Sequence, residues 1–292
     1  MPPPEPEANA EDSLEEAVAD PIDGYEPPVL SAREAARRGM PGWPRIGDEF
    51  PPPPIPVPAG RGGDQIIPRP LATHLGRPAP WADLPESRRR PTLADVVAAF
   101  AAAGPAHRSE RETLSDIDRP AAVLAPVYEQ DGEVFVVLTR RPWHMRSHSG
   151  EVSFPGGRQD DADADLWQTA LREAREEIAL DTYALEPIGE LDHLSTITSR
   201  SFIVPFVASL PGRPETTANP GEVSAVLHVS LTELLDPAIF REERWELPWA
   251  ENRPIFFFEL VGDTVWGATG AMLRQLLGLV TGTLSRGQLE HV

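Results

Sequence analysis

The segment 166–178, LWQTALREAREEI, constrains the fold most, because nothing in it breaks a helix and most of its residues favour one. Asp163 and Asp165 precede it as candidate N-caps. Asp165 followed by Gln168 has the spacing of a capping box. The sequence therefore predicts a helix over 166–178, and the rest of the chain must provide a core against which it packs.

The predicted helix has two different faces. Its apolar stripe, which we expect to face a core, holds Leu171, Ala174 and Ile178. On another face lie three carboxylates related by steps of three and four residues: Glu173, Glu176 and Glu177. Carboxylates gathered in this way repel one another, which costs a few tenths of a kcal/mol for each pair.

Two interpretations of this acidic face remain open. A hard divalent cation would turn the repulsion into attraction, and Mg²⁺ binds proteins through a few carboxylates together with substrate phosphates. Alternatively, the face is an ordinary solvated surface in which Arg172 and Arg175 partner the glutamates.

The residues upstream of the helix favour the cation. A short β-like run over 151–154 ends at Pro155-Gly156-Gly157. Glycines permit a close backbone approach and unusual backbone angles. A strand, a glycine loop and a helix of carboxylates form a frame that could hold a metal-bound diphosphate.

Together these features resemble the Nudix box, G-x5-E-x7-R-E-U-x-E-E-x-G-U, where U is aliphatic. Gly157 takes its first position, and its later positions are taken by Arg172, Glu173, Ala174, Glu176, Glu177 and Leu180. The chain departs from the pattern twice. The loop from Gly157 to Arg172 is one residue longer and carries Asp163 or Asp165 in place of the glutamate, which leaves the role of the loop acid open. Ala179 replaces the late glycine, which changes the helix end but removes no ligand.

A second resemblance is more specific and concerns the residues before the box. It is similar to the extended signature of the coenzyme A pyrophosphatase branch of the Nudix hydrolases. The residues that carry it are Leu138, Thr139, Arg141, Pro142, Arg146, Gly150, Val152, Phe154, Pro155, Gly156 and Gly157. The broader likeness runs from about residue 119 to about residue 282.

These resemblances imply an α+β Nudix fold, with a mixed β-sheet sandwiched between helices. They imply Mg²⁺ or Mn²⁺ as cofactor, held by Glu173, Glu176, Glu177 and the carbonyl of Gly156. The catalytic set would be Glu173, Glu177 and Arg172, with Glu173 as candidate general base and Arg172 pairing with a helix or loop acid. Glu222, beside the turn Asn219-Pro220-Gly221, is an alternative base or an ordinary strand-edge acid.

Arg141 and Arg146 are the candidate substrate-binding residues. Guanidinium groups bind phosphates through paired hydrogen bonds, so both could contact the nucleotide phosphates. The alternative is that they form surface ion pairs in an acidic protein.

The predicted activity is hydrolysis of the pyrophosphate bond of coenzyme A or its derivatives, giving phosphopantetheine and adenosine 3′,5′-bisphosphate. The alternatives are a Nudix pyrophosphatase for another nucleotide, such as a nucleotide sugar or a damaged nucleotide, and a non-catalytic Nudix-shaped binding module. The predicted partner is therefore a small nucleotide.

Composition excludes several other classes of function. The net charge of −20 and the pI of about 4.7 disfavour nucleic-acid binding. The absence of cysteine excludes disulfides and thiolate chemistry and fits the cytoplasm. The first residues lack the basic and apolar regions of a secretory signal, and no stretch approaches the ~20 apolar residues that span a bilayer.

Three regions are predicted along the chain. Residues 1–90 hold more than half of the 34 prolines and show no apolar periodicity, so we expect a disordered extension apart from a possible short helix over 31–38. Residues 91–282 form the Nudix domain, and residues 283–292 a flexible tail.

Within the domain, Thr92 and Asp95 begin a predicted helix that ends near Gly104. A hairpin is expected around Asp131-Gly132, between strands over 121–128 and 134–139. Further strands are expected over 184–191, 202–210 and 222–229, with a polar loop over 196–201, a short helix over 231–235, a hairpin over 255–266 and an amphipathic helix over 270–281.

Overall fold

The computed structural model describes residues 51–108, 119–145, 148–195, 201–247 and 250–288. The helix expected over 31–38, most of the polar loop over 196–201 and Arg146 lie outside these ranges. No helix within the ranges is long and apolar enough to cross a membrane.

A mixed sheet of eight strands forms the centre of the molecule. Its strands are β2 (Arg119–Gln130), β3 (Glu133–Arg140), β4 (Val152–Ser153), β5 (Gly156–Arg158), β6 (Glu186–Glu190), β7 (Leu194–Ser195), β8 (Ser201–Leu210) and β9 (Ala225–Ser230). Strands β2 and β8 run parallel and the other pairs are antiparallel. The predicted β2–β3 hairpin is confirmed, and Asp131 and Gly132 both adopt positive φ at its turn.

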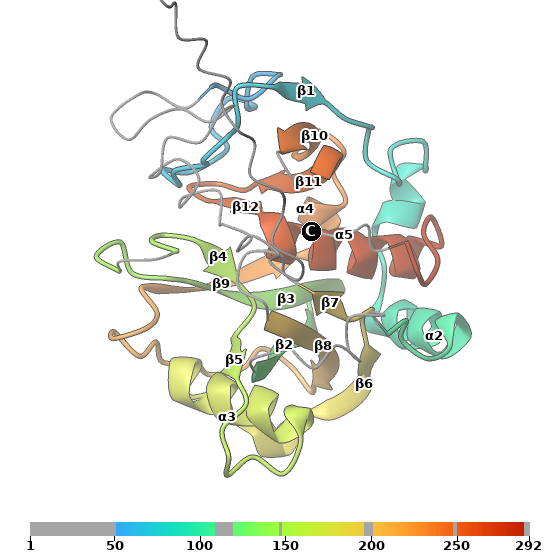
Figure 1. Cartoon of the computed structure of the whole chain (residues 1–292). Helices are drawn as coiled ribbons and strands as arrows, with labels where there is room; N and C mark the ends of the chain where they lie inside the picture. Colours follow the sequence, from blue (N-terminus) through green and yellow to red (C-terminus); the bar gives the residue numbers. More distant parts are fainter. Residues whose placement is uncertain (1–50, 109–118, 146–147, 196–200, 248–249, 289–292) are drawn as a thin grey trace, which may run out of the picture.

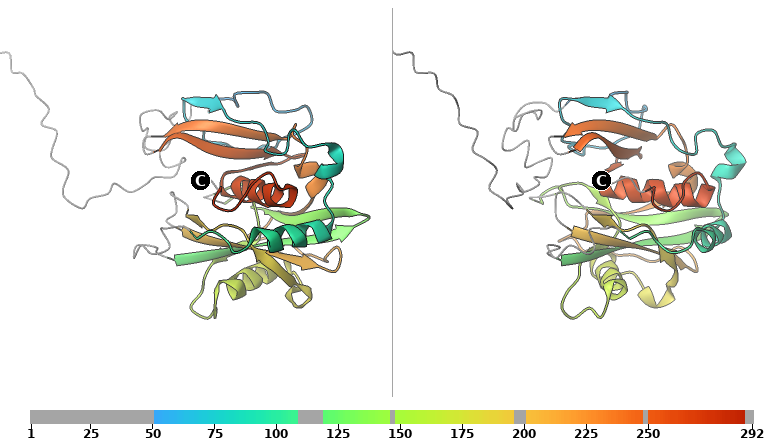
Figure 2. Two further views of the ribbon diagram at one scale, coloured as in Figure 1. Left: turned by 90° about the vertical axis from the view of Figure 1, so that its right-hand side faces the viewer. Right: turned by 45° about the vertical axis from the view of Figure 1, so that its right-hand side comes forward.

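Helices cover both faces of this sheet, which confirms the predicted fold class. Helix α3 (Leu166–Ile178) packs on one face against β2 and β5. Helices α2 (Leu93–Ala103) and α5 (Gly267–Thr281) lie together on the other face (Figures 1 and 2). The predicted start of α2 is confirmed, because Thr92 and Asp95 form a reciprocal capping box.

A second sheet was not predicted. It has four strands in the order β1 (Thr73–Leu75), β10 (Phe240–Leu247), β11 (Ala250–Glu259) and β12 (Thr264–Trp266). It covers the side of α5 that faces away from the large sheet, so α5 lies between two sheets (Figure 2). The helix predicted over 270–281 is confirmed as α5, but its expected amphipathic character is wrong, because even Arg274 and Gln275 are buried.

The predicted boundary at residue 90 is also wrong, because residues 51–90 include packed structure. Strand β1 pairs with β10. Trp81 is fully buried in the core and lies 5.4 Å, between ring centroids, from Phe240. The segment 61–72, called here the N-terminal strap, lies over the outer face of the small sheet (Figure 1). There, Arg69 pairs with the buried Glu243 at 2.9 Å. Proline-rich composition does not reveal these long-range contacts.

The tail predicted from residue 283 is fixed at least as far as Gln288. The backbone N–H of Gly287 donates to Asp192 Oδ2 at 2.7 Å, and Arg274 donates to the carbonyl of Gln288 at 3.2 Å. Buried polar partners on the domain therefore hold a segment whose own composition is polar.

Smaller shifts concern element ends. Residues 182–184 form a 3₁₀ turn (η3) and β6 begins only at Glu186, while β9 begins at Ala225 rather than at Glu222. The short helix α4 (Leu231–Leu234) is confirmed, as is the β11–β12 hairpin. A second 3₁₀ turn, η1, spans Glu86–Arg89.

Candidate active site

The glycine loop fills a wedge between two strands that separate. Strands β2 and β3 pair next to their turn, and beyond it β2 pairs with β5 while β3 pairs with β4. Phe154, between β4 and β5, is buried and anchors the wedge in the core. The glycine loop is therefore held beside the first residues of β2, and α3 comes after the loop in the chain.

A side chain at either of two glycines in this wedge would force a neighbouring group to move. Gly156 has φ 157°, and a Cβ there would lie 2.4 Å from the carbonyl oxygen of Ala122. A Cβ on Gly157 would lie 2.3 Å from Glu173 Oε1. Glycine at 157 thus lets the first helix glutamate lie directly against the loop backbone.

Helix α3 is fixed at both ends by local contacts. Asp165 is the N-cap, and its side chain accepts from the N–H of Gln168 at 2.8 Å. Ala179 ends the helix in the left-handed conformation, with φ 53°, which explains why glycine is the usual residue there. The buried stripe runs through Ala170, Ala174 and Ile178, so the prediction that Leu171 belongs to it is wrong.

The three glutamates differ in exposure. Glu177 is buried, the Glu173 side chain is 15% exposed, and the Glu176 side chain is 54% exposed. Glu177 Oε2 accepts a hydrogen bond of 3.2 Å from the N–H of Gly156. Glu173 and Glu177 therefore face the glycine loop, while Glu176 lies towards solvent.

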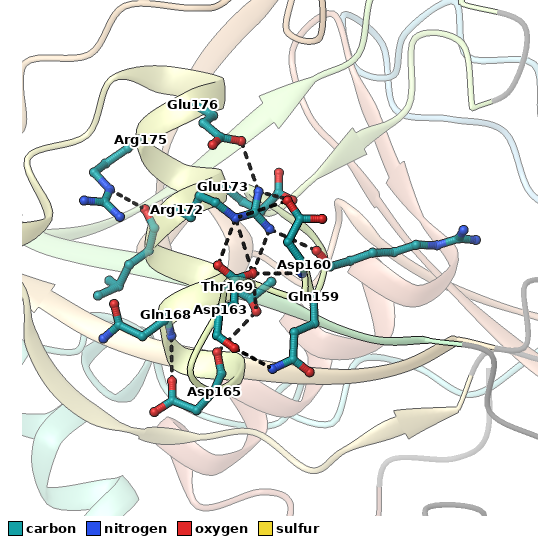
Figure 3. Close-up of polar contacts among 12 residues, drawn as sticks. Gln159, Asp160, Asp163, Asp165, Gln168, Thr169, Arg172, Glu173, Arg175 and Glu176 are labelled. Carbon is teal, nitrogen blue, oxygen red and sulfur yellow. Dashed lines mark hydrogen bonds and ion pairs between the residues drawn. The ribbon is translucent and has the colours of Figure 1, made fainter. Parts of the chain in front are cut away.

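Arg172 is the hub that ties the loop to the helix (Figure 3). Its Nε and NH2 donate to the two carboxylate oxygens of Asp163, each at 3.0 Å. Its NH1 donates to both Glu173 and Glu176 at 3.0 Å. Thr169 donates to Asp163 as well, at 3.0 Å. The loop acid whose role the sequence left open is thus Asp163, while Asp165 serves as the N-cap.

The charges of this cluster shift its titration. Arg172 lowers the pKa of Asp163 to about 2, chiefly through its hydrogen bonds. Burial raises the pKa of Glu177 to about 8, and the negative charges of Glu173 and Glu222 add to the increase. Burial likewise raises the pKa of Glu173. Two carboxylates therefore lie in a poorly hydrated place where neighbouring positive groups offset their negative charge only in part.

Glu222 approaches this cluster although it is distant in sequence. The N–H of Asn219 donates to the carbonyl of Glu177 at 2.8 Å, which docks the turn before β9 on the end of α3. Glu222 lies in that turn, close enough for its charge to act on Glu173 and Glu177. The sequence could not show that Glu222 lies close to the other carboxylates.

Arg141 also lies near the glutamates. It follows β3, and its positive charge acts to lower the pKa of Glu177. The Nε atom of Arg141 is buried without a hydrogen-bond partner among the described residues. Arg146 lies outside the described ranges, so its predicted contact with substrate stays a prediction.

The described residues contain no preformed group of three acidic or histidine side chains that could hold a metal ion. Arg172 explains this arrangement, because its NH1 group lies between Glu173 and Glu176 and satisfies both. The donors nevertheless suit a hard cation: they are carboxylate oxygens, two of them poorly hydrated and close to further negative charge.

Two hollows occur away from the glutamates. One, of about 710 Å³, is lined by Arg61, His228 and Glu233 among others. The other, of about 920 Å³, lies between α2 and the end of α5. Neither is lined by the glycine loop or by α3.

Comparisons with known proteins cover the segment that holds these residues. The NUDIX domain family matches residues 118–249, which include the glycine loop, α3 and Glu222. The chain is 35% identical over 191 residues to the uncharacterized Nudix hydrolase NudL of Escherichia coli O1:K1 / APEC, covering 63% of this chain and 93% of that protein. The NudL of Shigella boydii serotype 18 gives the same values.

Solved structures match less closely. A Caenorhabditis elegans Ap4A hydrolase binary complex matches with 19% identity and a TM-score of 0.35, covering 41% of this chain and 85% of that chain. The NUDIX domain of Shewanella oneidensis NrtR complexed with ADP ribose matches with 23% identity and a TM-score of 0.34, covering 44% and 86%. The match to NudL carries the assignment: this chain belongs to the Nudix hydrolases, and it is a pyrophosphohydrolase.

Proposed function

We propose that this protein hydrolyses the pyrophosphate bond of coenzyme A or its derivatives, giving phosphopantetheine and adenosine 3′,5′-bisphosphate. The observation that carries the proposal is the position of Arg141, in the stretch that resembles the coenzyme A branch. Its guanidinium acts on the carboxylate of Glu177, and its Nε has no hydrogen-bond partner in the described part of the chain. The positive charge of Arg141 beside the acidic cluster suits the binding of a substrate that carries several phosphates.

Nudix hydrolases generally use divalent cations, and we propose Mg²⁺ or Mn²⁺ here. Glu173, Glu176, Glu177 and the carbonyl of Gly156 would hold the ion. Bound there, a divalent cation would polarise phosphoryl oxygens and lower the pKa of a water. The fit rests on the repulsion between the poorly hydrated carboxylates, which such a charge would relieve.

The chain's own residues would divide the remaining tasks. Glu173 lies half-buried against Gly157 with a raised pKa, which suits a general base that takes a proton from water near neutral pH. Arg172 holds Glu173 and Glu176 relative to the loop through Asp163. Arg141, and Arg146 by prediction, would bind the nucleotide phosphates. Glu222 is the alternative base, since its charge reaches the same carboxylates.

Product analysis tests the proposal. The purified protein is incubated with coenzyme A, ADP-ribose, a nucleotide sugar and a panel of nucleoside triphosphates, with Mg²⁺ and then with Mn²⁺, and the products are separated and identified. We expect adenosine 3′,5′-bisphosphate from coenzyme A. Cleavage only of another nucleotide would retain the reaction and overturn the coenzyme A assignment. No cation-dependent cleavage of any compound would favour the binding-module alternative.

A further inference from the structure

We propose that Gln65, in the N-terminal strap, is a positioning residue that holds the loop of Arg141 in place for substrate binding. Gln65 lies far from the motifs in sequence, and its side chain is buried. The inference rests on the proposed role of Arg141 as a phosphate-binding residue. It adds a segment outside the matched family region to the machinery of the site.

The Gln65 amide uses all of its hydrogen-bonding groups to join three segments. Its Nε2 donates to the carbonyl of Gly150 at 3.0 Å and to Asp263 Oδ1 at 2.8 Å. Its Oε1 accepts from the N–H of Thr264 at 2.9 Å. Two donors and one acceptor are needed here, and among uncharged side chains of this length only glutamine supplies them.

These contacts fix both ends of the loop between β3 and β4. Gly150 is at its far end. At its near end, Arg140 pairs with Asp263 at 3.3 Å, so the same carboxylate that accepts from Gln65 also holds the residue before Arg141. The backbone N–H of Arg141 then donates to the carbonyl of Glu151 at 2.9 Å and closes the base of the loop.

The strap itself is held tightly against the β11–β12 hairpin. The N–H of Gly62 donates to the carbonyl of Leu260 at 2.7 Å. A Cβ on Gly63 would lie 2.5 Å from the carbonyl oxygen of Gly262 and 2.3 Å from Gln65 Oε1. The backbone of Gln65 is therefore held in place, and its side-chain hydrogen bonds can hold the loop in turn. A displacement of about 1 Å in a group that positions substrate is enough to weaken turnover substantially.

Gln65→Met, which keeps the length of the side chain and removes its polar atoms, tests the role. On the nucleotide that the wild type hydrolyses, we expect KM to rise roughly five- to tenfold with a smaller change in kcat, since binding contacts are loosened and the glutamates are untouched. Asp263→Asn, which disturbs the same junction from its other partner, should change KM in the same direction. Gln275→Met is the matched control: Gln275 is also buried, and it accepts from the N–H of Asp192 at 2.9 Å but does not contact this loop, so KM should not change.

A double-mutant cycle separates positioning from general stability. In an Arg141→Met background, Gln65→Met should raise KM no further, because the contact that it positions is already gone. Independent, multiplicative losses would overturn the proposal, as would a lower Tm with an unchanged KM.

Hydrogen exchange gives a readout that does not depend on catalysis. In Gln65→Met we expect faster exchange at the N–H groups of Arg141 and Glu151, with unchanged exchange in α3. Unchanged exchange in the loop would overturn the proposal even if the wild type hydrolyses coenzyme A. A wild type that hydrolyses nothing would instead contradict the proposed function, and the exchange result would still decide whether Gln65 holds the loop.

Discussion

Arg172 holds Asp163 through two hydrogen bonds of 3.0 Å, from Nε to Oδ1 and from NH2 to Oδ2. The same guanidinium donates to Glu173 and Glu176, so one side chain fixes the loop acid and two glutamates together. The longer loop before α3 therefore keeps an acid in the place where the arginine requires one.

Arg172→Lys should lower kcat by about ten- to a hundredfold while the protein stays folded, because an ammonium group cannot reproduce the paired geometry that orients Asp163 and the glutamates. Steady-state kinetics with circular dichroism checks this. Arg175→Lys is the control: its Nε donates to the carbonyl of Leu171 on the exposed side of α3, so activity should be unaffected. A normal kcat in Arg172→Lys would contradict the claim that Arg172 orients Asp163 and the glutamates.

The stability of the metal-free protein should fall as pH rises from about 4.5 to about 8. The pKa of Glu177 is raised to about 8 in the folded state, against an ordinary value of 4.5 when unfolded. Between these values the folded state binds more protons than the unfolded state, so each increase in pH favours unfolding.

Urea unfolding across this pH range, in the presence of a chelator, measures the effect. Glu177→Gln should be less sensitive to pH than the wild type, because its amide does not ionise. Mg²⁺ should stabilise the wild type more at pH 8 than at pH 5, since the cation competes with the proton. A wild type and a variant with parallel pH profiles would contradict the raised pKa.

Trp81→Ala should destabilise the domain by about 3–5 kcal/mol, because the indole is fully buried against Phe240 and Phe258 and its removal leaves a large cavity. Chemical denaturation gives the free energy of unfolding. Tyr183→Ala removes an aromatic side chain that is 94% exposed and should change stability by less than about 0.5 kcal/mol. Equal effects of the two substitutions would mean that residue 81 lies outside the folded domain.

Ala179→Gly should stabilise the protein by about 0.5–1 kcal/mol, since the left-handed conformation at the end of α3 strains an alanine but not a glycine. The same substitution at Ala102, an exposed position within α2, should destabilise by a similar amount. Opposite shifts in Tm are therefore expected, and a loss of stability at position 179 would contradict the helix end described here.

Local signals predicted the parts of the fold that depend on neighbouring residues. The caps of α2 and α3, the turn at Asp131-Gly132 and the glycine loop each involve residues close in sequence. The gathering of Glu173 and Glu177 beside the loop followed from helix periodicity and from the family resemblance. The loop acid that pairs with Arg172 is Asp163, one of the two aspartates that the sequence offered for this position.

The small sheet and the strap could not be predicted in the same way. Strand β10 reads FREERWEL, and a run of four charged residues ordinarily indicates an exposed segment. In the fold, Arg241 pairs with Glu243 and Glu259, and Arg69 of the strap also pairs with Glu243. Burial of these charges depends on partners that lie far apart in the chain, as does the approach of Glu222 to α3.

Isosteric replacement of the glutamates tests the central claim most directly. Glu173→Gln and Glu177→Gln are compared with Glu186→Gln, an exposed position on β6, by measuring turnover of the substrate identified for the wild type and binding of Mn²⁺ by electron paramagnetic resonance. We predict that both site variants lose at least about a hundredfold in kcat and bind Mn²⁺ more weakly, while Glu186→Gln matches the wild type. Site variants with the wild-type kcat and Mn²⁺ affinity would contradict the placement of the active site on α3.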